Sequence, residues 1–557
     1  MRVPRVFEVS SIVLLATALA MAQPVITPSG VVNAAGAIPG GLPNTGIALG
    51  SIFLINGSGL GADNPTPMNL LQNTTFPLPS SQGLNGTTVQ IKTNITSGYA
   101  ILLYESATQI AAIMPSNTPY GQAAVTVTYN GQTSASAAIM VVQKQFDVFT
   151  TNGSGGGPGY IVNVNSNTDQ VTNRVSRPAR PGQLVYLVGT GLGAVRGDET
   201  QGTFQGDMPG LVLDLQIYVG GKPVVIDQNT DYMGRVSCCA GIDEVYFQVP
   251  RGVLGCYLPV VVVTDGLSSN TTTMSISSDG SPCSEPSVGL IGADLQTMIG
   301  NNSAREGVIS LGQSLTNLVG PNGSLQSQAS LGGAGFSSLT AAQFVSLPGA
   351  FPSPGGCIVT PVNAAAAPQP PVGTALDAGP VINVNGPNGS TQMAQSSDGT
   401  SYAATLDNSF LAPGSYEVDN GGGGNDVGPF QATINTPPAF TWTPQPAGES
   451  VPKNVPLLIT WKGGDPNGLV LAVGLSADST GQVGARFMCT QAASSGNLTV
   501  PVYILSWMPT NTLPISVLTV FEYVQSRFSA PGLDAGYFLY QIGQAVNVQF
   551  SQPQAKF

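Results

Sequence analysis

Few residues of this sequence could carry out catalysis, because only 8% of the chain is charged and no histidine is present. The missing histidine excludes a Ser-His-Asp or Cys-His site, a histidine-ligated zinc and a histidine proton shuttle. A pair of carboxylates needs no histidine, and glycoside hydrolases use such a pair. The candidates are scattered at expected strand edges and turns: Asp243, Glu244, Asp426 and Asp465. We therefore expect no enzyme and no cofactor, and keep a carboxylate-dependent glycoside hydrolase as an alternative.

The glycine-rich segment from Gly189 to Gly193 could be mistaken for a phosphate-binding loop. The dinucleotide fingerprint needs a helix directly after its glycines. Here V-R-G-D follows at residues 195–198, and no amphipathic helix comes after it. This pattern favours a turn between strands.

Six cysteines are the disulfide candidates: Cys238, Cys239, Cys256, Cys283, Cys357 and Cys489. In an exported chain disulfides are the default state of cysteine. A bond between the adjacent Cys238 and Cys239 would strain the geometry, so we expect one of them to pair with Cys256 and the other with Cys283. Cys357 is expected to pair with Cys489. A metal or redox role for Cys238 and Cys239 is the alternative, but it lacks the C-x-x-C spacing.

Calcium and sugar are the remaining ligands to consider. The polar stretch from Asn163 to Asp169 holds one carboxylate and lacks the glycine and terminal glutamate of an EF-hand, so we expect no metal site. Trp442, Trp461 and Trp507 all follow residue 440. Exposed, they could contact a glycan by stacking on sugar rings. Buried in strands they would belong to the core, which is the commoner fate of tryptophan.

An internal repeat shows which elements position these residues. Gly50 to Ala62 and Gly182 to Ala194 agree at six of thirteen positions with an offset of 132. An apolar run closed by glycines predicts a strand buried on both faces, followed by a turn that needs positive φ. Gly131 and Ser134 correspond to Gly266 and Ser269 at an offset of 135.

The repeated pattern resembles immunoglobulin-like repeats of the IPT/TIG type. It consists of an apolar strand, G-[ST]-G-L-G, a strand ending in proline, a valine-rich strand and a [ND]-G-x-x-S turn. With V-V-N-A-A at residues 31–35, it is most similar to a tandem module of secreted acidobacterial proteins. The resemblance covers about residues 30–278 and implies a β-sandwich fold and an exported location. It implies no substrate.

Length and composition predict several domains of short strands. The chain has 557 residues, 70 of them glycine and 44 proline, and domains average about 150 residues. We predict an all-β chain of tandem immunoglobulin-like sandwiches in a beads-on-a-string arrangement. The predicted domains are residues 23–145, 146–284, 285–440, which begins like a linker, and 441–557.

The first 22 residues resemble a signal peptide. Arg2 and Arg5 precede an apolar run, and Ala20-Met21-Ala22 forms a cleavage site. No later stretch has the roughly 18 apolar residues of a spanning helix. The net charge of −12 and the 17 basic residues argue against nucleic acid as a partner. We expect a protein that is secreted or held at the cell surface.

The function expected from these observations is interaction, adhesion or spacing outside the cell, with an extracellular protein or polysaccharide as partner. A glycan-binding protein that uses the three tryptophans is the second hypothesis, and the glycoside hydrolase is the third. The sequence does not identify the ligand.

Overall fold

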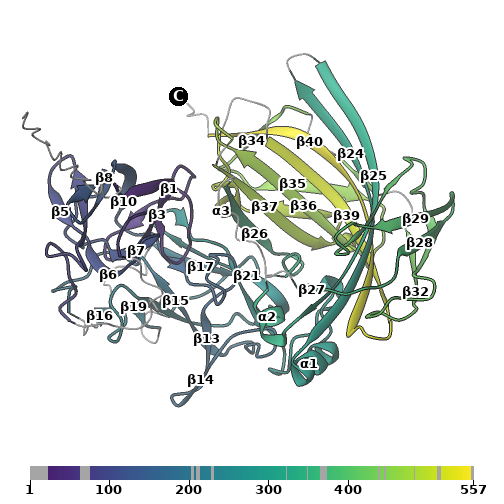
Figure 1. The fold of residues 1–557 in the computed structure, drawn as a ribbon, viewed down its shortest axis with the longest axis horizontal. Helices are drawn as coiled ribbons and strands as arrows, with labels where there is room; N and C mark the ends of the chain where they lie inside the picture. The colour runs from purple at the N-terminus through teal and green to yellow at the C-terminus, as the bar shows by residue number, and fades with distance from the viewer. Residues whose placement is uncertain are drawn as a thin grey trace, which may run out of the picture.

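A computed structural model describes residues 23–62, 76–201, 206–207, 214–227, 231–320, 323–347, 349–363, 373–436, 440–443, 447–481, 483–510 and 516–552. The expected signal peptide therefore lies outside the described residues. Figure 1 shows two compact β domains on one side and a long curved sheet on the other.

Domain 1 is a β-sandwich. One sheet has the strand order β1-β3-β7-β6, and the facing sheet has the order β2-β10-β8-β4-β5. Val89, Val125 and Phe53 are fully buried between them because alternate side chains of each strand point inward. The strands are β1 (Val25–Asn33), β2 (Ile47–Ala48), β3 (Ile52–Ser58), β4 (Thr87–Thr93), β5 (Ser97–Tyr99), β6 (Ile101–Glu105), β7 (Gln109–Ile113), β8 (Gly121–Tyr129), β9 (Gln132–Thr133) and β10 (Ala137–Val142).

Domain 2 repeats this plan with its own core. Its sheets have the orders β14-β13-β15-β20-β19-β16 and β12-β23-β21-β17-β18, and Phe247, Val260 and Leu187 are buried between them. The strands are β11 (Asp147–Val148), β12 (Gly157–Pro158), β13 (Ile161–Ser166), β14 (Asp169–Thr172), β15 (Leu184–Thr190), β16 (Gly206–Asp207), β17 (Leu215–Val219), β18 (Lys222–Pro223), β19 (Met233–Arg235), β20 (Asp243–Gln248), β21 (Gly255–Thr264), β22 (Leu267–Ser268) and β23 (Thr272–Ile276).

The repeated glycine segments form equivalent strands, as predicted. β3 lies between β1 and β7, and β15 lies between β13 and β20. The turn after β15 requires glycine, because Gly191 has φ +112° and a Cβ there would lie 2.0 Å from the carbonyl oxygen of Gln145. The tandem sandwich prediction is confirmed for this half of the chain.

The two sandwiches follow one another in the chain, but they also pack against each other. Ile52 and Ile113 of domain 1 share an apolar cluster with Val188 and Ile242 of domain 2. The backbone N–H of Ile52 donates to the Thr190 hydroxyl at 2.9 Å. Domains 1 and 2, which were predicted to follow one another like beads on a string, are therefore also joined by a packed interface.

The C-terminal half is built on one long sheet with the order β26-β37-β36-β39-β40-β24-β25-β30-β29-β28-β31-β32. Its elements are α1 (Gly292–Asn301), β24 (Ala304–Gly320), β25 (Gly323–Leu339), α2 (Ala341–Ser346), β26 (Cys357–Asn363), β27 (Thr374–Ala375), β28 (Val381–Gly386), β29 (Gly389–Gln395), β30 (Tyr402–Leu406), β31 (Gly414–Asp419), β32 (Gln431–Thr436), β33 (Thr441–Trp442), β34 (Ser450–Pro452), β35 (Leu457–Lys462), β36 (Leu469–Ala477), β37 (Val483–Ala492), β38 (Asn497–Val500), α3 (Val502–Leu505), β39 (Ser516–Phe528) and β40 (Ala535–Ser551), with short 3-10 turns at Pro286–Val288 and Ala493–Ser495.

This sheet crosses the division predicted at residue 440. Two cores lie on it, and each combines residues from both sides of that position. One joins Cys357 and Val359 to Trp461 and Val520, and the other joins Phe336 and Tyr416 to Phe528 and Phe538. The shared strands explain this mixing, because β40 pairs with β39 and also, in parallel, with β24.

Candidate functional site

The strongest candidate for a binding site is a cavity of about 510 Å³ between domain 2, the segment around α2 and the long sheet. We call it the aromatic cavity. Six aromatic side chains line it: Tyr257, Phe344, Phe351, Phe521, Tyr523 and Tyr537. A concave, largely apolar site with a few polar groups is the usual form of a small-ligand pocket.

Strand alternation places the wall residues on one face of the long sheet. Phe521, Tyr523 and Gln525 follow each other at spacings of two along β39, and Tyr537, Leu539 and Gln541 do so along β40. The register sets Tyr523 opposite Gln541 and Gln525 opposite Leu539. Each of the two neighbouring strands therefore contributes both aromatic and amide side chains to the same wall of the cavity.

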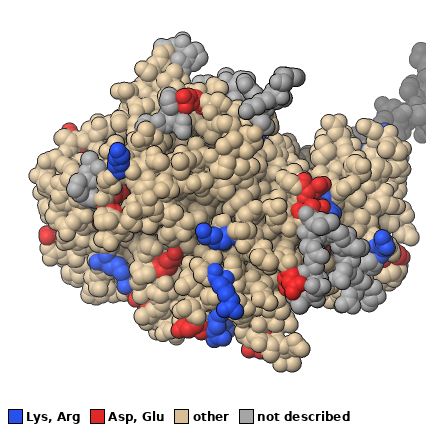
Figure 2. Space-filling view, turned by 180° about the vertical axis from the view of Figure 1, so that it is seen from behind, with Lys and Arg blue, Asp and Glu red and all other residues tan. Residues whose placement is uncertain are grey.

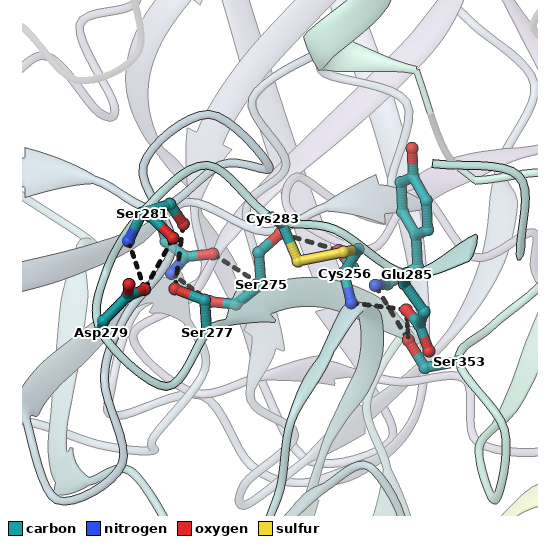
Figure 3. The surroundings of a disulfide bond; sticks show 10 residues. Cys256, Ser275, Ser277, Asp279, Ser281, Cys283, Glu285 and Ser353 are labelled. Carbon is teal, nitrogen blue, oxygen red and sulfur yellow. Dashed lines mark hydrogen bonds between the residues drawn. A yellow bond between two sulfur atoms is a disulfide. The ribbon is translucent and has the colours of Figure 1, made fainter. Parts of the chain in front are cut away.

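The opposite wall is fixed to domain 2 by the disulfide between Cys256 and Cys283 (Figure 3). Next to it, Glu285 accepts hydrogen bonds at 2.7 Å from the Cys256 backbone N–H and from the Ser353 hydroxyl. The Ser353 hydroxyl also accepts the Tyr257 N–H at 3.0 Å. Burial raises the pKa of Glu285, and these two hydrogen bonds oppose the shift. Tyr257 thus projects from a backbone held by a covalent bond and a buried carboxyl.

Glu306, like Gln541, is a polar residue of the aromatic cavity whose side chain has no hydrogen-bond partner among the described residues. Burial raises its pKa to about 7, and the nearby Asp534 and Asp294 add to the shift. No hydrogen bond or ion pair joins its carboxyl group to another residue in the described part of the chain. At neutral pH this carboxyl can either donate or accept a hydrogen bond from a ligand.

Three further polar side chains around the aromatic cavity, those of Tyr523, Tyr537 and Arg527, are already oriented by the protein. The Tyr537 hydroxyl donates to the Gly289 carbonyl, and the Tyr523 hydroxyl donates to Gln525 Oε1 at 3.2 Å. Arg527 pairs with Asp294 and lies 5.9 Å from the centre of the Tyr537 ring. These contacts fix the aromatic rings before a ligand arrives, which lowers the entropy cost of binding.

The tryptophans are not part of this or any other exposed surface. Trp442 and Trp461 are 5% exposed and Trp507 is fully buried, all in one core of the long sheet. The Trp461 indole donates to the Ala493 carbonyl at 2.8 Å. Glycan contacts through these residues are therefore excluded, because their ring faces are covered by the core.

The cysteine pairing differs from the prediction within domain 2. Cys238 bonds to Cys239, and Cys256 bonds to Cys283 with a Cα–Cα distance of 5.6 Å. The expected cross-pairing was wrong because Cys239 packs at the interface with domain 1, whereas Cys256 and Cys283 share a different cluster. The predicted bond between Cys357 and Cys489 is confirmed, since these residues are direct partners on β26 and β37. Disulfides at all six cysteines indicate an oxidising, extracytoplasmic location.

The carboxylates proposed for catalysis have separate structural surroundings. Asp243 is fully buried, pairs with Arg235 at 2.7 Å and accepts the backbone N–H groups of Gly191 and Leu192. Glu244 has its pKa raised by burial. Asp426 accepts from a backbone N–H in a turn at 2.9 Å, and the backbone N–H of Asp465 donates to Glu522.

The glycine loop binds an anion, but the anion is the protein's own Asp243. In domain 1, Glu105 does the same by accepting the Ala62 N–H at 2.7 Å. The turn prediction is thus confirmed, and the N–H groups of Gly191 and Leu192 are already bonded to Asp243.

The polar stretch considered for calcium forms hydrogen bonds within the protein. Asn163 donates to the Arg177 carbonyl at 2.9 Å, and Asn165 donates to Asp169 at 3.1 Å. Among the described residues, no group of three or more acidic or cysteine side chains is arranged to hold a metal ion.

The residues of the aromatic cavity were missed by sequence reasoning because they come from segments far apart in the chain. A weak signal was present: both β39 and β40 carry an aromatic residue four positions before a glutamine, at Phe521 and Gln525 and at Tyr537 and Gln541. That spacing places both members of each pair on one face of a strand. It does not show that the two strands are neighbours.

Comparison with known proteins leaves the family open. No protein-family model matches the chain, and no curated protein does. Among solved structures, the chain is similar to SGBP-B from a xyloglucan utilization locus of Bacteroides uniformis, with 12% identity, a TM-score of 0.16 and coverage of 70% of this chain and 88% of that one. It is also similar to domains 5–6 of the S-layer protein SbsC, with 12% identity, a TM-score of 0.16 and coverage of 46% and 98%. Such low scores carry no conclusion on ligand or activity.

Proposed function

We propose that this chain is an exported, non-enzymatic surface protein that binds a neutral glycan in the aromatic cavity. Domains 1 and 2 act as a spacer that presents this cavity. The observation that carries the proposal is the meeting of six aromatic rings with Glu306, Gln525 and Gln541 in one cavity of about 510 Å³.

The chemistry of the lining suits a sugar. The rings of Tyr257, Phe344 and Phe521, which are only partly buried, can pack against the apolar C–H faces of a pyranose. Amide and carboxyl groups at the same cavity can exchange hydrogen bonds with hydroxyl groups, and such groups confer specificity because a missing hydroxyl leaves them unpaired. The cavity holds a small oligosaccharide unit, so a longer chain would enter by one end or one branch.

The surface of the protein supports an uncharged partner. Figure 2 shows charged side chains in small groups separated by broad uncharged areas. No helix among the described residues combines the length and the apolar character of a membrane span. Export is supported by the disulfides, by the expected signal peptide and by the resemblance of residues 30–278 to secreted IPT/TIG repeats.

The test is calorimetric titration of the full chain with a panel of neutral oligosaccharides of two to four residues. Phe521→Ala should weaken binding at least tenfold, because it removes a partly exposed stacking ring from the cavity wall. Phe521→Leu separates stacking from packing, since it keeps apolar volume in the wall. Tyr120→Ala is the matched control, because Tyr120 is 66% exposed on domain 1.

Two results would contradict the proposal. One is the absence of binding to every member of the panel, and the other is binding that Phe521→Ala and Phe521→Leu leave unchanged. Release of reducing ends during long incubation, lost in Glu306→Gln, would instead favour the hydrolase.

A further inference from the structure

A second recess lies on domain 1, far from the aromatic cavity in the sequence. It has a volume of about 970 Å³ and runs between β1 and β10. We call it the β10 groove. Ile26, Ala137 and Ile139 line it as half-buried side chains at the margin of the domain 1 core. The side of the sandwich is therefore open here.

The backbone of β10 presents unpaired hydrogen-bonding groups to this groove. The Val142 carbonyl accepts the Leu49 N–H at 3.1 Å on the edge next to β2. Because backbone groups alternate along a strand, the N–H and C=O groups of Met140 and Ala138 point to the same edge. β2 pairs only with Val141 and Val142. Among the described residues, β10 pairs only with β8 and, at Val141 and Val142, with β2, so no strand is paired with it on this edge at Met140 and Ala138.

Domain 2 shows what the same edge looks like when it is covered. At the offset of 135, Ala138 and Met140 correspond to Thr273 and Ser275 on β23. The Thr273 carbonyl accepts the Gly159 N–H at 2.9 Å, next to the parallel strand β12. The Ser275 carbonyl accepts the Ala179 N–H at 2.9 Å. The Ser275 N–H donates to the Asn173 side chain at 2.7 Å.

The end of the β10 groove holds buried polar atoms without partners. These are Asn33 Nδ2, Gln145 Oε1 and Asp147 Oδ2, and each residue is at most 2% exposed. Burial raises the pKa of Asp147 to about 7, although the Asn270 N–H bonds its other oxygen at 3.0 Å. Unsatisfied buried polar groups are costly.

We propose that the β10 groove binds an extended, uncharged peptide segment of a partner protein, which pairs with the edge of β10 at Ala138 and Met140. Its alternate side chains pack on Ile26 and Ile139, and its backbone supplies the hydrogen bonds that β12 and the Ala179 segment supply in domain 2. Addition of a strand to an exposed sheet edge is a general mode of peptide recognition. The lining contains one lysine and one aspartate, Lys92 and Asp147, which favours a segment without charge.

The experiment uses the full chain and a synthetic acetylated peptide amide, Thr-Val-Thr-Val-Thr, with fluorescence labelling at one end. Its control is the same peptide with N-methyl groups on alternate residues, which keeps the side chains and blocks one hydrogen-bonding edge. Binding is measured by fluorescence anisotropy. Amide hydrogen exchange of residues 136–142 locates the bound peptide.

We expect the unmethylated peptide to bind and to slow exchange in residues 136–142 at least tenfold. Met140→Pro removes an edge N–H that forms no bond inside the domain, and it should weaken binding about tenfold. Met140→Val keeps this N–H and should bind like the unchanged chain. Thermal unfolding of both variants verifies that domain 1 is folded.

Three results would overturn the proposal. They are equal binding of the methylated peptide, peptide binding without protection of residues 136–142, and dimerisation of the chain that Met140→Pro abolishes. The last result would assign the edge to a second copy of the chain.

Discussion

Domains 1 and 2 share one fold and one repeated core strand. The equivalent sheet edge, however, is covered at β23 in domain 2 and open at β10 in domain 1. In domain 2 the segment that precedes the glycine strand stays on its own domain, where Asn173 binds Ser275 and Val175 packs beside Cys256 and Cys283. In domain 1 the segment that precedes the glycine strand extends away from its own domain and contacts the C-terminal half. Ile38 and Leu42 pack into a core of the C-terminal sheet, and Asn44 donates to Ser506 at 3.0 Å.

This contrast indicates that the edge of domain 1 is open because the corresponding segment docks on the C-terminal half. The segment that could cover Met140 is used to hold domain 1 against the C-terminal sheet.

The largest effect is expected at Arg235, which belongs to domain 2. Its guanidinium pairs with the buried Asp243 and donates to the Gly50 carbonyl of domain 1 at 2.8 Å. Arg235→Ala leaves a buried carboxylate without its cation, and such a change costs about 3–5 kcal/mol. Urea unfolding measures this loss in the free energy of unfolding, and hydrogen exchange of β15 and β20 shows whether domain 2 is the part affected.

The control for Arg235 is Lys144→Ala. Lys144 and Asp214 form an ion pair at 2.8 Å that is partly exposed, so its loss should cost at most about 1 kcal/mol. Equal effects of the two substitutions would contradict the structural role assigned to Arg235.

The second prediction concerns the disulfide that domain 2 has and domain 1 lacks. Cys256 and Cys283 close a loop of 27 residues, and loop entropy gives about 3.5 kcal/mol for that length. The double variant Cys256→Ala, Cys283→Ala should lower the stability of domain 2 by this amount and leave exchange in β4 and β8 unchanged. Because Tyr257 follows Cys256, the variant should also weaken ligand binding in the aromatic cavity.

The adjacent pair supplies the matched control. Cys238→Ala with Cys239→Ala opens no long loop and should cost far less than the other double variant. A larger loss from this pair would show that the interface with domain 1, where Cys239 packs, depends on the bond itself.

The third prediction is a pH dependence at Asp147, between the β10 groove and domain 2. Its folded pKa of about 7 lies above its ordinary value of 3.8. The folded state therefore holds the proton more tightly than the unfolded state. Stability from this group is fully present below pH 4 and is lost as the pH rises from about 4 to 7. The loss is roughly 2–4 kcal/mol, because one pKa unit corresponds to about 1.4 kcal/mol.

Asp147→Asn should remove this loss while keeping an oxygen that accepts the Asn270 N–H. We expect the variant to be more stable than the unchanged chain at pH 8 and similar to it at pH 4. Because Glu306 and Glu522 also titrate near pH 7, the difference between the two proteins is the quantity to follow in urea unfolding. A constant difference across this range would be evidence against a buried, protonated Asp147.

The sequence indicated the sandwich repeat well because the repeat is local. Thirteen residues, from Gly182 to Ala194, contain both the buried strand and its turn. The aromatic cavity and the β10 groove could not be found in this way, since each depends on which distant strands are neighbours. The burial of the tryptophans could not be predicted from the sequence for the same reason. Trp461 alternates with exposed residues on β35, and only the fold shows that the face of the strand that carries it is covered. The cysteine pairing was predicted wrongly because the strain expected in an adjacent pair decided it, whereas the positions of the loops, which the sequence does not show, keep Cys239 apart from Cys256 and Cys283.

The smallest effect is expected at Met140, on the strand edge that is open in domain 1 and covered in domain 2. Met140→Pro removes an N–H that bonds to no described residue, and edge strands tolerate proline, so stability should change by less than about 1 kcal/mol. Ser275→Pro at the equivalent position removes the N–H that donates to Asn173 and the hydroxyl that donates to the Cys256 carbonyl at 2.7 Å. Losing buried hydrogen bonds costs about 1–3 kcal/mol each, so this substitution should cost several times more. Thermal unfolding with hydrogen exchange of β10 and β23 compares them, and equal losses would mean that the edge of β10 is covered in solution.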